Sequence, residues 1–410
     1  MKIDSFLQAQ VDDQLIEQGA FSTIDLLINC GRLDYGDYER WRRRELETLD
    51  AVLMGDVQKI TAEMAQTGAY ARAIGLIEES QEFHSWGNDA SPALLKLSRD
   101  AKLHAVMAAR YVPAQDVRQQ DLFFHNPITA LTNGIASALA GRNAREAQRL
   151  LDLLYAQAPT HADLAAYDRL CAAIAALEFP VDSCEHELRS MLELVPLAKR
   201  LLSSQARDAL VPLWRRLGRA LVQHPFDPEA SDLHASFAFE QAQDWMAVRE
   251  SVLHEEDWRH HSALALRMAR AASALADRQQ AVTAWFQLCW RHPEFAERAL
   301  ESRHDANSIL RHAWLRFAET EDFGDALTIV DFPAWYLLNE PGLVQFLSED
   351  LAQDCAADES YRLVHRWLQA RRAKQDSDQM ALRKALSANH PGLFRVLRDK
   401  AGQEANTLRF

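Results

Sequence analysis

The chain has 410 residues, which is enough for two to four folding units of ordinary size. It holds 14 glycines and 13 prolines, whereas average usage would give roughly 50 of the two together. Sandwiches, propellers and large barrels need these residues in closely spaced turns, so their scarcity argues against such folds. The composition therefore predicts an all-α protein.

The net charge of the chain is strongly negative. Its 45 lysines and arginines stand against 59 aspartates and glutamates, so the formal net charge is −14. A field of this sign repels phosphate backbones. The charge balance therefore disfavours nucleic acid as a partner.

Two features bear on the compartment. The N-terminus lacks the apolar core of a signal peptide, and the longest stretch without Asp, Glu, Lys or Arg, residues 122–141, is too polar to cross a bilayer. The five cysteines are an odd set without a Cys-x-x-Cys spacing, which indicates buried thiols in a reducing compartment. We therefore predict a cytoplasmic protein with no membrane segment.

The first part of the chain carries several short amphipathic helices with recognisable start signals. Ser22 or Thr23 is placed to cap one helix, and Asp34 and Asp56 precede two others. Side-chain oxygens at such positions accept hydrogen bonds from the first free N–H groups of a helix. Residues 1–125 are therefore predicted to form an N-terminal helical cluster.

Beyond residue 125 the pattern changes to helix pairs. Asn143 with Glu146 three residues later predicts a capped helix over residues 144–157, and Thr160 is expected to cap its partner. Stacked pairs of this kind build an α-solenoid-like array. We expect this array at residues 126–303. A C-terminal helical region is expected at residues 304–410, either as a separate region or as a continuation of the array.

A short internal echo follows. Residues 194–201 and 210–217 share the pattern Leu-Val-Pro-Leu-x-[Lys/Arg]-Arg-Leu. Proline at the first helical position would start both segments, because its missing N–H is not needed there. A proline kink within a longer helix is the alternative interpretation.

Two adjacent windows of 34 residues, 228–261 and 262–295, place small residues at matching positions. The matching pairs are Ala235 with Ala269, Ala238 with Ala272, and Ala247 with Ala281. The second window adds Trp285 four residues after Ala281, and Pro293 eight residues after Trp285. In period and in these residues the region resembles the tetratricopeptide repeat family, over 68 of the 410 residues.

The resemblance implies a helical array that binds a protein or peptide segment on its concave face. Matching the register places five residues on that face: Asp232, Ser236, Phe239, Glu240 and Arg270. We therefore expect a non-enzymatic scaffold or adaptor that binds a partner in a helical groove.

The sequence contains none of the common catalytic motifs. No phosphate-binding glycine loop, dinucleotide fingerprint or Gly-x-Ser-x-Gly elbow is present. Residues 254–261 are rich in histidine and acid, but Trp258 stands where a zinc-protease motif needs its second histidine. We therefore expect no catalytic residue, no cofactor and no metal.

Two alternative functions stay open at this point. One is an enzyme whose site is assembled in a helical groove from dispersed residues. The other is a nucleic-acid-associated regulator that uses the segment Arg40–Arg44, in which four arginines surround Trp41. Because acidic residues flank this segment, an ordinary solvated or interfacial face is the favoured interpretation.

Overall fold

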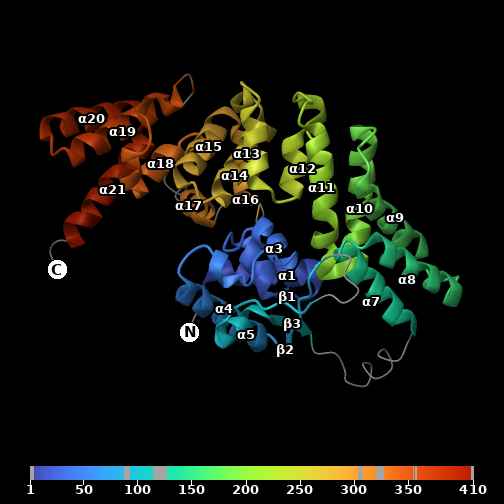
Figure 1. The fold of residues 1–410 in the computed structure, drawn as a ribbon. Helices are drawn as coiled ribbons and strands as arrows, with labels where there is room; N and C mark the ends of the chain where they lie inside the picture. The colour runs from blue at the N-terminus through green and yellow to red at the C-terminus, as the bar shows by residue number, and fades with distance from the viewer. Residues whose placement is uncertain are drawn as a thin grey trace. The chain divides into compact units, whose positions relative to one another are not determined.

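The computed structural model describes residues 4–86, 93–113, 127–302, 308–319, 327–353, 355 and 358–407. Helices dominate it, and consecutive helices pack against each other (Figure 1), which confirms the predicted all-α fold class. The chain forms two compact units, Met1–Asp244 and Trp245–Phe410. The three regions expected from the sequence stay predictions.

The N-terminal part of the first unit combines short helices with a small antiparallel sheet. Its helical elements are α1 (Ser5–Gln18), α2 (Thr23–Asn29), α3 (Tyr35–Arg42), η1 (Asp50–Val52), α4 (Val57–Ala73) and α5 (Ala101–Met107). The strands are β1 (Phe21–Ser22), β2 (Leu76–Ser80) and β3 (Ala109–Pro113), in the order β1-β3-β2. In the register, Tyr111 of β3 lies opposite both Phe21 and Glu78. The sequence did not predict this sheet, whose strands are too short to affect composition.

Helix starts in this part agree with the capping signals. The Ser22 side chain accepts a hydrogen bond from the Asp25 N–H, so Ser22 rather than Thr23 is the cap. Asp34 caps α3 and Asp56 caps α4 in the same way. These local predictions are confirmed because a cap involves only neighbouring residues.

The rest of the first unit is a succession of packed helices. They are α7 (Pro127–Ala140), α8 (Ala144–Gln157), α9 (Leu164–Ala175), η2 (Ala176–Glu178), α10 (Cys184–Leu202), η3 (Ser203–Gln205), α11 (Ala206–Leu221), η4 (Pro228–Ala230) and α12 (Ala235–Gln241). Asn143 caps α8 as expected, with its side chain accepting from the Glu146 N–H at 3.0 Å. The prediction for Thr160 is wrong, because α9 begins only after Asp163.

The two prolines of the echo lie inside helices, so the proposal that they start helices is wrong. Pro196 lies within α10 and Pro212 within α11. Both helices bury an apolar face on either side of the proline, and that burial outweighs one lost hydrogen bond. Because Pro212 has no N–H, it cannot donate to the Asp208 carbonyl four residues earlier.

The second unit contains further helix pairs. Its helices are α13 (Trp245–Leu253), η5 (Trp258–His260), α14 (Ser262–Ala274), α15 (Arg278–Arg291), α16 (Pro293–Glu301), α17 (Ser308–Ala318), α18 (Phe332–Asn339), η7 (Pro341–Gln345), η8 (Glu349–Ala352), α19 (Asp358–Arg372), α20 (Asp376–Asn389) and α21 (Pro391–Thr407). Within the described part of the chain, every helix is too short or too polar to cross a membrane.

The second 34-residue window forms the closely packed pair α14 and α15. Its small residues Ala269, Ala272 and Ala281 are buried, as is Trp285. Small side chains let the two helix backbones approach each other, and the tryptophan fills the space beside them. The first window contains the boundary between the two units, which falls between α12 and α13.

Candidate partner-binding groove

Helix α3 presents one continuous polar and aromatic face to the interior of the first unit. Tyr35, Tyr38, Glu39 and Arg42 follow the spacing i, i+3, i+4, i+7, which places them on the same side of a helix. The first three are buried, and the side chain of Arg42 is 14% exposed. This face is therefore a buried contact surface, although half of its members are charged.

Asp208 of α11 is the partner of the two tyrosines. Its Oδ1 accepts a hydrogen bond from the Tyr35 hydroxyl at 2.9 Å, and its Oδ2 accepts one from the Tyr38 hydroxyl at 3.4 Å. The Arg42 guanidinium lies 3.8 Å away and also donates to the Tyr38 oxygen. Burial raises the pKa of Asp208 against the lowering effect of Arg42. Two hydroxyls and one cation thus satisfy the carboxylate of Asp208.

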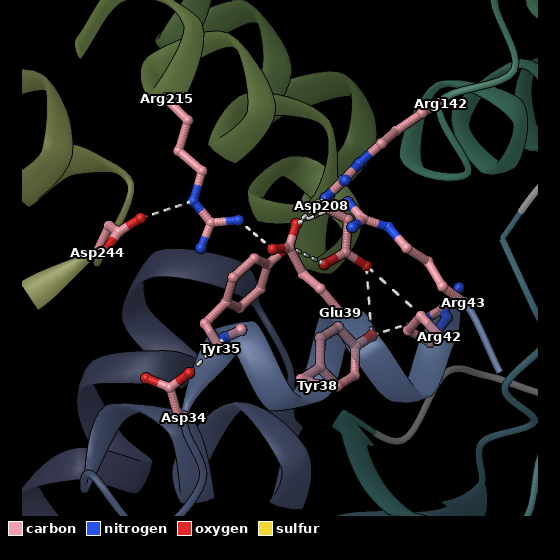
Figure 2. A network of polar contacts seen from close by, with 11 residues as sticks. Asp34, Tyr35, Tyr38, Glu39, Arg42, Arg43, Arg142, Asp208, Arg215 and Asp244 are labelled. Atoms are coloured by element: carbon pink, nitrogen blue, oxygen red, sulfur yellow. Dashed lines mark hydrogen bonds and ion pairs between the residues drawn. The ribbon is translucent and has the colours of Figure 1, made fainter. Parts of the chain in front are cut away.

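Glu39 lies between two arginines from different elements, as Figure 2 shows. Arg142 from the turn between α7 and α8 and Arg215 from α11 each donate to one of its carboxylate oxygens. Arg215 also pairs with Asp244 at 3.2 Å. Burial alone would raise the pKa of Glu39, but the two guanidinium groups outweigh it and lower that pKa. Glu39 is therefore a fixed anion at neutral pH.

A further ion pair extends this contact to α2. Arg207 of α11 contacts Asp25 at 3.3 Å and donates to the Asn29 side chain at 2.7 Å. Together with Asp208 and Glu39, it attaches α2 and α3 to one side of α11. We call these residues the α3–α11 clamp: Asp25, Asn29, Tyr35, Tyr38, Glu39, Arg42, Arg142, Arg207, Asp208 and Arg215.

An open groove of about 1130 Å³ runs beside the clamp. Glu39, Arg142 and Arg215 belong to both the clamp and the groove lining. The groove also receives Arg43 from the end of α3 and Arg219 from α11. The clamp therefore forms part of the wall of a cavity that a ligand could occupy.

The wall opposite α11 is the segment between η2 and α10. Arg216 holds this segment in place by donating to the Phe179 carbonyl at 2.8 Å and to the Pro180 carbonyl at 2.9 Å, and it pairs with Glu187. The Phe179 side chain is 64% exposed. Three guanidinium-carrying residues of one helix, Arg215, Arg216 and Arg219, thus shape or line the groove.

Two titratable groups of the groove have pKa values that their surroundings shift. Burial raises the pKa of the Cys184 thiol, which keeps it protonated and weakly nucleophilic. Glu39 is held ionised by its arginines. In the part of the chain that the structure describes, no group of three His, Cys, Asp or Glu residues is arranged to hold a metal ion.

The residues predicted from the repeat register are partly buried. Ser236 is fully buried, with its Oγ 2.8 Å from the His234 Nδ1. Phe239 is also buried and packs against α11. Asp232 is exposed and Glu240 is half-buried on the same segment. Arg270 lies on α14 of the second unit, where it is half-buried.

The segment Arg40–Arg44 is divided between three environments. Arg42 turns inward and lies over the Trp86 ring at 4.7 Å. Arg40 pairs with Asp37 at 2.9 Å, and Arg43 reaches the groove.

The helical spacing of Tyr35 to Arg42 is the one sequence signal that could have revealed the clamp. Its partners on α11 carry no local pattern, because they are about 170 residues away in the chain.

No protein-family model, curated protein or solved structure matches the chain. The case for a function therefore rests on the geometry of the groove and on the residues that line it.

Proposed function

We propose that this protein is a non-enzymatic interaction scaffold or adaptor, and that it binds a segment of a partner protein in the groove beside α11. The observation that carries the proposal is the groove itself, which is open, about 1130 Å³ in volume and lined by exposed as well as half-buried arginines. The α3–α11 clamp forms part of its wall, and Arg216 holds the segment between η2 and α10 that forms another part. A preformed surface of this kind binds a partner with little loss of conformational freedom.

The chemistry of the groove favours binding over catalysis. A general acid or base works best with a pKa near the operating pH. Two arginines lower the pKa of Glu39 and keep it ionised, and burial keeps the Cys184 thiol protonated. The alternative of an enzyme with dispersed residues has less support from these groups than the scaffold has from the groove.

The alternative of a nucleic-acid regulator is also weaker. Of the arginines in Arg40–Arg44, Arg42 belongs to the clamp, where it pairs with Asp208, and Arg40 pairs with Asp37. Arg43 lines the groove and lies 3.9 Å from the Glu39 carboxylate. A protein partner agrees with this distribution better than a phosphate backbone, which needs a continuous row of free cations.

The helix pairs support a repeat-like architecture for the proposed scaffold. The pair α14 and α15 carries the buried small residues that the tetratricopeptide pattern requires, and we propose that this pattern describes the middle of the chain. All five cysteines are free thiols, which suits the reducing cytoplasm that we propose as its location.

A blocking variant tests the proposal. Ala220 lines the groove on α11, so Ala220→Trp would fill it, whereas Ala172→Trp adds the same side chain at an exposed position of α9 outside the groove lining. Partners recovered by affinity purification and quantified by mass spectrometry should be lost with Ala220→Trp and retained with Ala172→Trp. Equal recovery with both folded variants would contradict the proposal.

The face predicted from the repeat register has its own test. Replacing Asp232, Glu240 and Arg270 together with alanine should reduce partner recovery if this face also contacts the partner. Unchanged recovery would remove these three residues from the binding surface and leave the α11 groove as the proposed site.

A further inference from the structure

We infer that the occupant of the groove is an acidic segment of a partner protein, with aspartate or glutamate side chains next to an apolar residue. This inference rests on the proposed function and specifies the chemistry of the partner. It follows from the charges on the two walls and from the apolar residues between them.

The first step is the excess of guanidinium groups around Glu39. This single carboxylate, whose side chain is 5% exposed, is contacted by Arg142 and Arg215, and Arg43 approaches to 3.9 Å. The buried Nε of Arg142 makes no hydrogen bond to the described residues. Two carboxylates, Glu39 and Asp244, stand against the three guanidinium groups, so one positive charge in this part of the groove is left for a ligand.

Arg219 is a second source of positive charge in the groove. It lies one helical turn after Arg215 on α11, and its side chain is exposed without an ion pair in the described part of the chain. Like charges four residues apart destabilise a helix slightly. Arg219 also lies in the last turn of α11, where a positive charge interacts favourably with the helix dipole, but its exposed guanidinium lines the groove and is placed to contact an anionic ligand.

The acidic residues of the opposite wall have a local role. Asp182 and Glu185 flank Ser183, which caps α10 through a hydrogen bond to the His186 N–H. Negative side chains at a helix N-terminus offset the positive end of the helix dipole. Their charge is thus partly compensated by α10, and the arginine wall dominates the groove although the whole chain carries −14.

The remaining lining is apolar. Leu177, Val181, Pro212 and Leu233 lie along the groove, and they offer contact to one apolar side chain of the partner. The volume of about 1130 Å³ exceeds the roughly 300–1,000 Å³ of most small-molecule pockets, and the groove is open. A chain segment fits these dimensions better than a metabolite.

The test begins with peptides selected from a random 12-residue phage library on the immobilised full-length protein. We expect the selected peptides to be enriched in Asp and Glu together with an apolar residue. Fluorescein-labelled copies are then titrated by anisotropy. Arg219→Glu should weaken binding about tenfold, and Arg219→Lys should keep most of it, because the interaction depends mainly on charge.

Arg189→Glu on α10 is the matched control. Arg189 is also an exposed helical arginine without an ion pair among the described residues, and it lies outside the groove lining. Binding by this variant should change less than about twofold, since a charge outside the contact acts only through screened long-range forces. Equal weakening by Arg189→Glu and Arg219→Glu would overturn the inference.

The outcomes separate the inference from the proposed function. Selected peptides that lack acidic residues and tolerate Arg219→Glu, but are lost with Ala220→Trp, would overturn the inference and leave the groove function standing. A selection that yields no peptide sensitive to Ala220→Trp counts against both. A fluorescein-labelled single-stranded RNA of 20 nucleotides is titrated in the same way. If it bound more tightly than the selected peptides and depended on Arg219, the inference would be overturned in favour of nucleic acid.

Discussion

At the scale of single residues, Glu39 joins three elements of the first unit, which meet at its carboxylate. Glu39→Ala would leave Arg142 and Arg215, whose side chains are 15% and 16% exposed, without their shared anion. We expect the first unit to lose about 3 kcal/mol of stability, the range for breaking a buried ion pair. Urea denaturation followed by circular dichroism measures the loss.

A surface pair provides the control for this substitution. Glu193 pairs with Arg169 at 2.8 Å, but both side chains are about half exposed. Exposed pairs contribute little to stability. Glu193→Ala should therefore leave the denaturation midpoint almost unchanged, and a loss equal to that of Glu39→Ala would contradict the structural role of the clamp.

The pKa values of the clamp predict an opposite pH dependence for its two carboxylates. The arginines lower the pKa of Glu39 below 4.5, so its stabilising contribution is present above 4.5 and lost as the pH falls through the lowered value. The difference in unfolding free energy between the wild type and Glu39→Gln should therefore shrink as the pH falls below 4.5. A difference that does not vary with pH would contradict this prediction.

Asp208 should behave in the reverse sense. Burial raises its pKa above 3.8, so the stability that it contributes is present below 3.8 and lost as the pH rises through the raised value. The wild type should therefore lose stability relative to Asp208→Asn as the pH rises above 3.8. Denaturation curves at several pH values measure both variants in one experiment.

At the scale of elements, the close approach of α11 and α12 depends on Gly218. A Cβ at this position would lie 2.7 Å from the Phe239 ring, so alanine requires the two helices to separate. Overpacking of this kind destabilises by about 1–3 kcal/mol, whereas alanine gains about 1 kcal/mol in helix propensity. We expect Gly218→Ala to lower the thermal midpoint of the first unit.

Two variants make this prediction specific. Gly134→Ala on α7 meets the flexible end of Leu150 at 3.0 Å, so it should be tolerated better than Gly218→Ala. Phe239→Leu introduced together with Gly218→Ala should restore part of the midpoint, because the ring that causes the clash is then absent. Additive losses in the double variant would contradict a direct contact.

Some features of the helices were predictable from the sequence, and others were not. Helix starts at Ser22, Asp34, Asp56 and Asn143 were predictable, since a cap is a contact between neighbouring residues. For the echo prolines the sequence left two interpretations open, and the structure agrees with the one that places them inside longer helices. A local pattern does not show whether the apolar face on either side is buried enough to continue the helix through a proline.

The groove was even less accessible to sequence analysis. Its arginines come from α3, the turn before α8, and α11, and no spacing relates residue 39 to residues 142 and 215. Arg40–Arg44 drew attention as a basic run, but the structure divides its side chains between the clamp, a surface ion pair and the groove. Composition predicted the fold class because it sums over the whole chain, whereas the site depends on a few long-range contacts.

At the scale of the whole molecule, each compact unit has its own apolar core. Trp41 and Leu217 are fully buried in the first unit, and Phe286 and Tyr361 in the second. Substitutions in one core should therefore act mainly on that unit. We predict that Glu39→Ala raises amide hydrogen exchange in α3 and α11 and leaves α15 and α18 unchanged, as measured by mass spectrometry of peptic fragments.

The reciprocal variant completes this prediction. The Tyr361 hydroxyl donates to the Ser348 carbonyl at 3.1 Å, and Tyr361→Phe removes that bond while it keeps the buried ring. Loss of such a hydrogen bond costs about 1 kcal/mol, so exchange should rise in α19 and around residue 348 but stay unchanged in α3 and α11. If either variant raised exchange equally in both units, the chain would unfold as a single cooperative body, and its stability would not divide between the two cores.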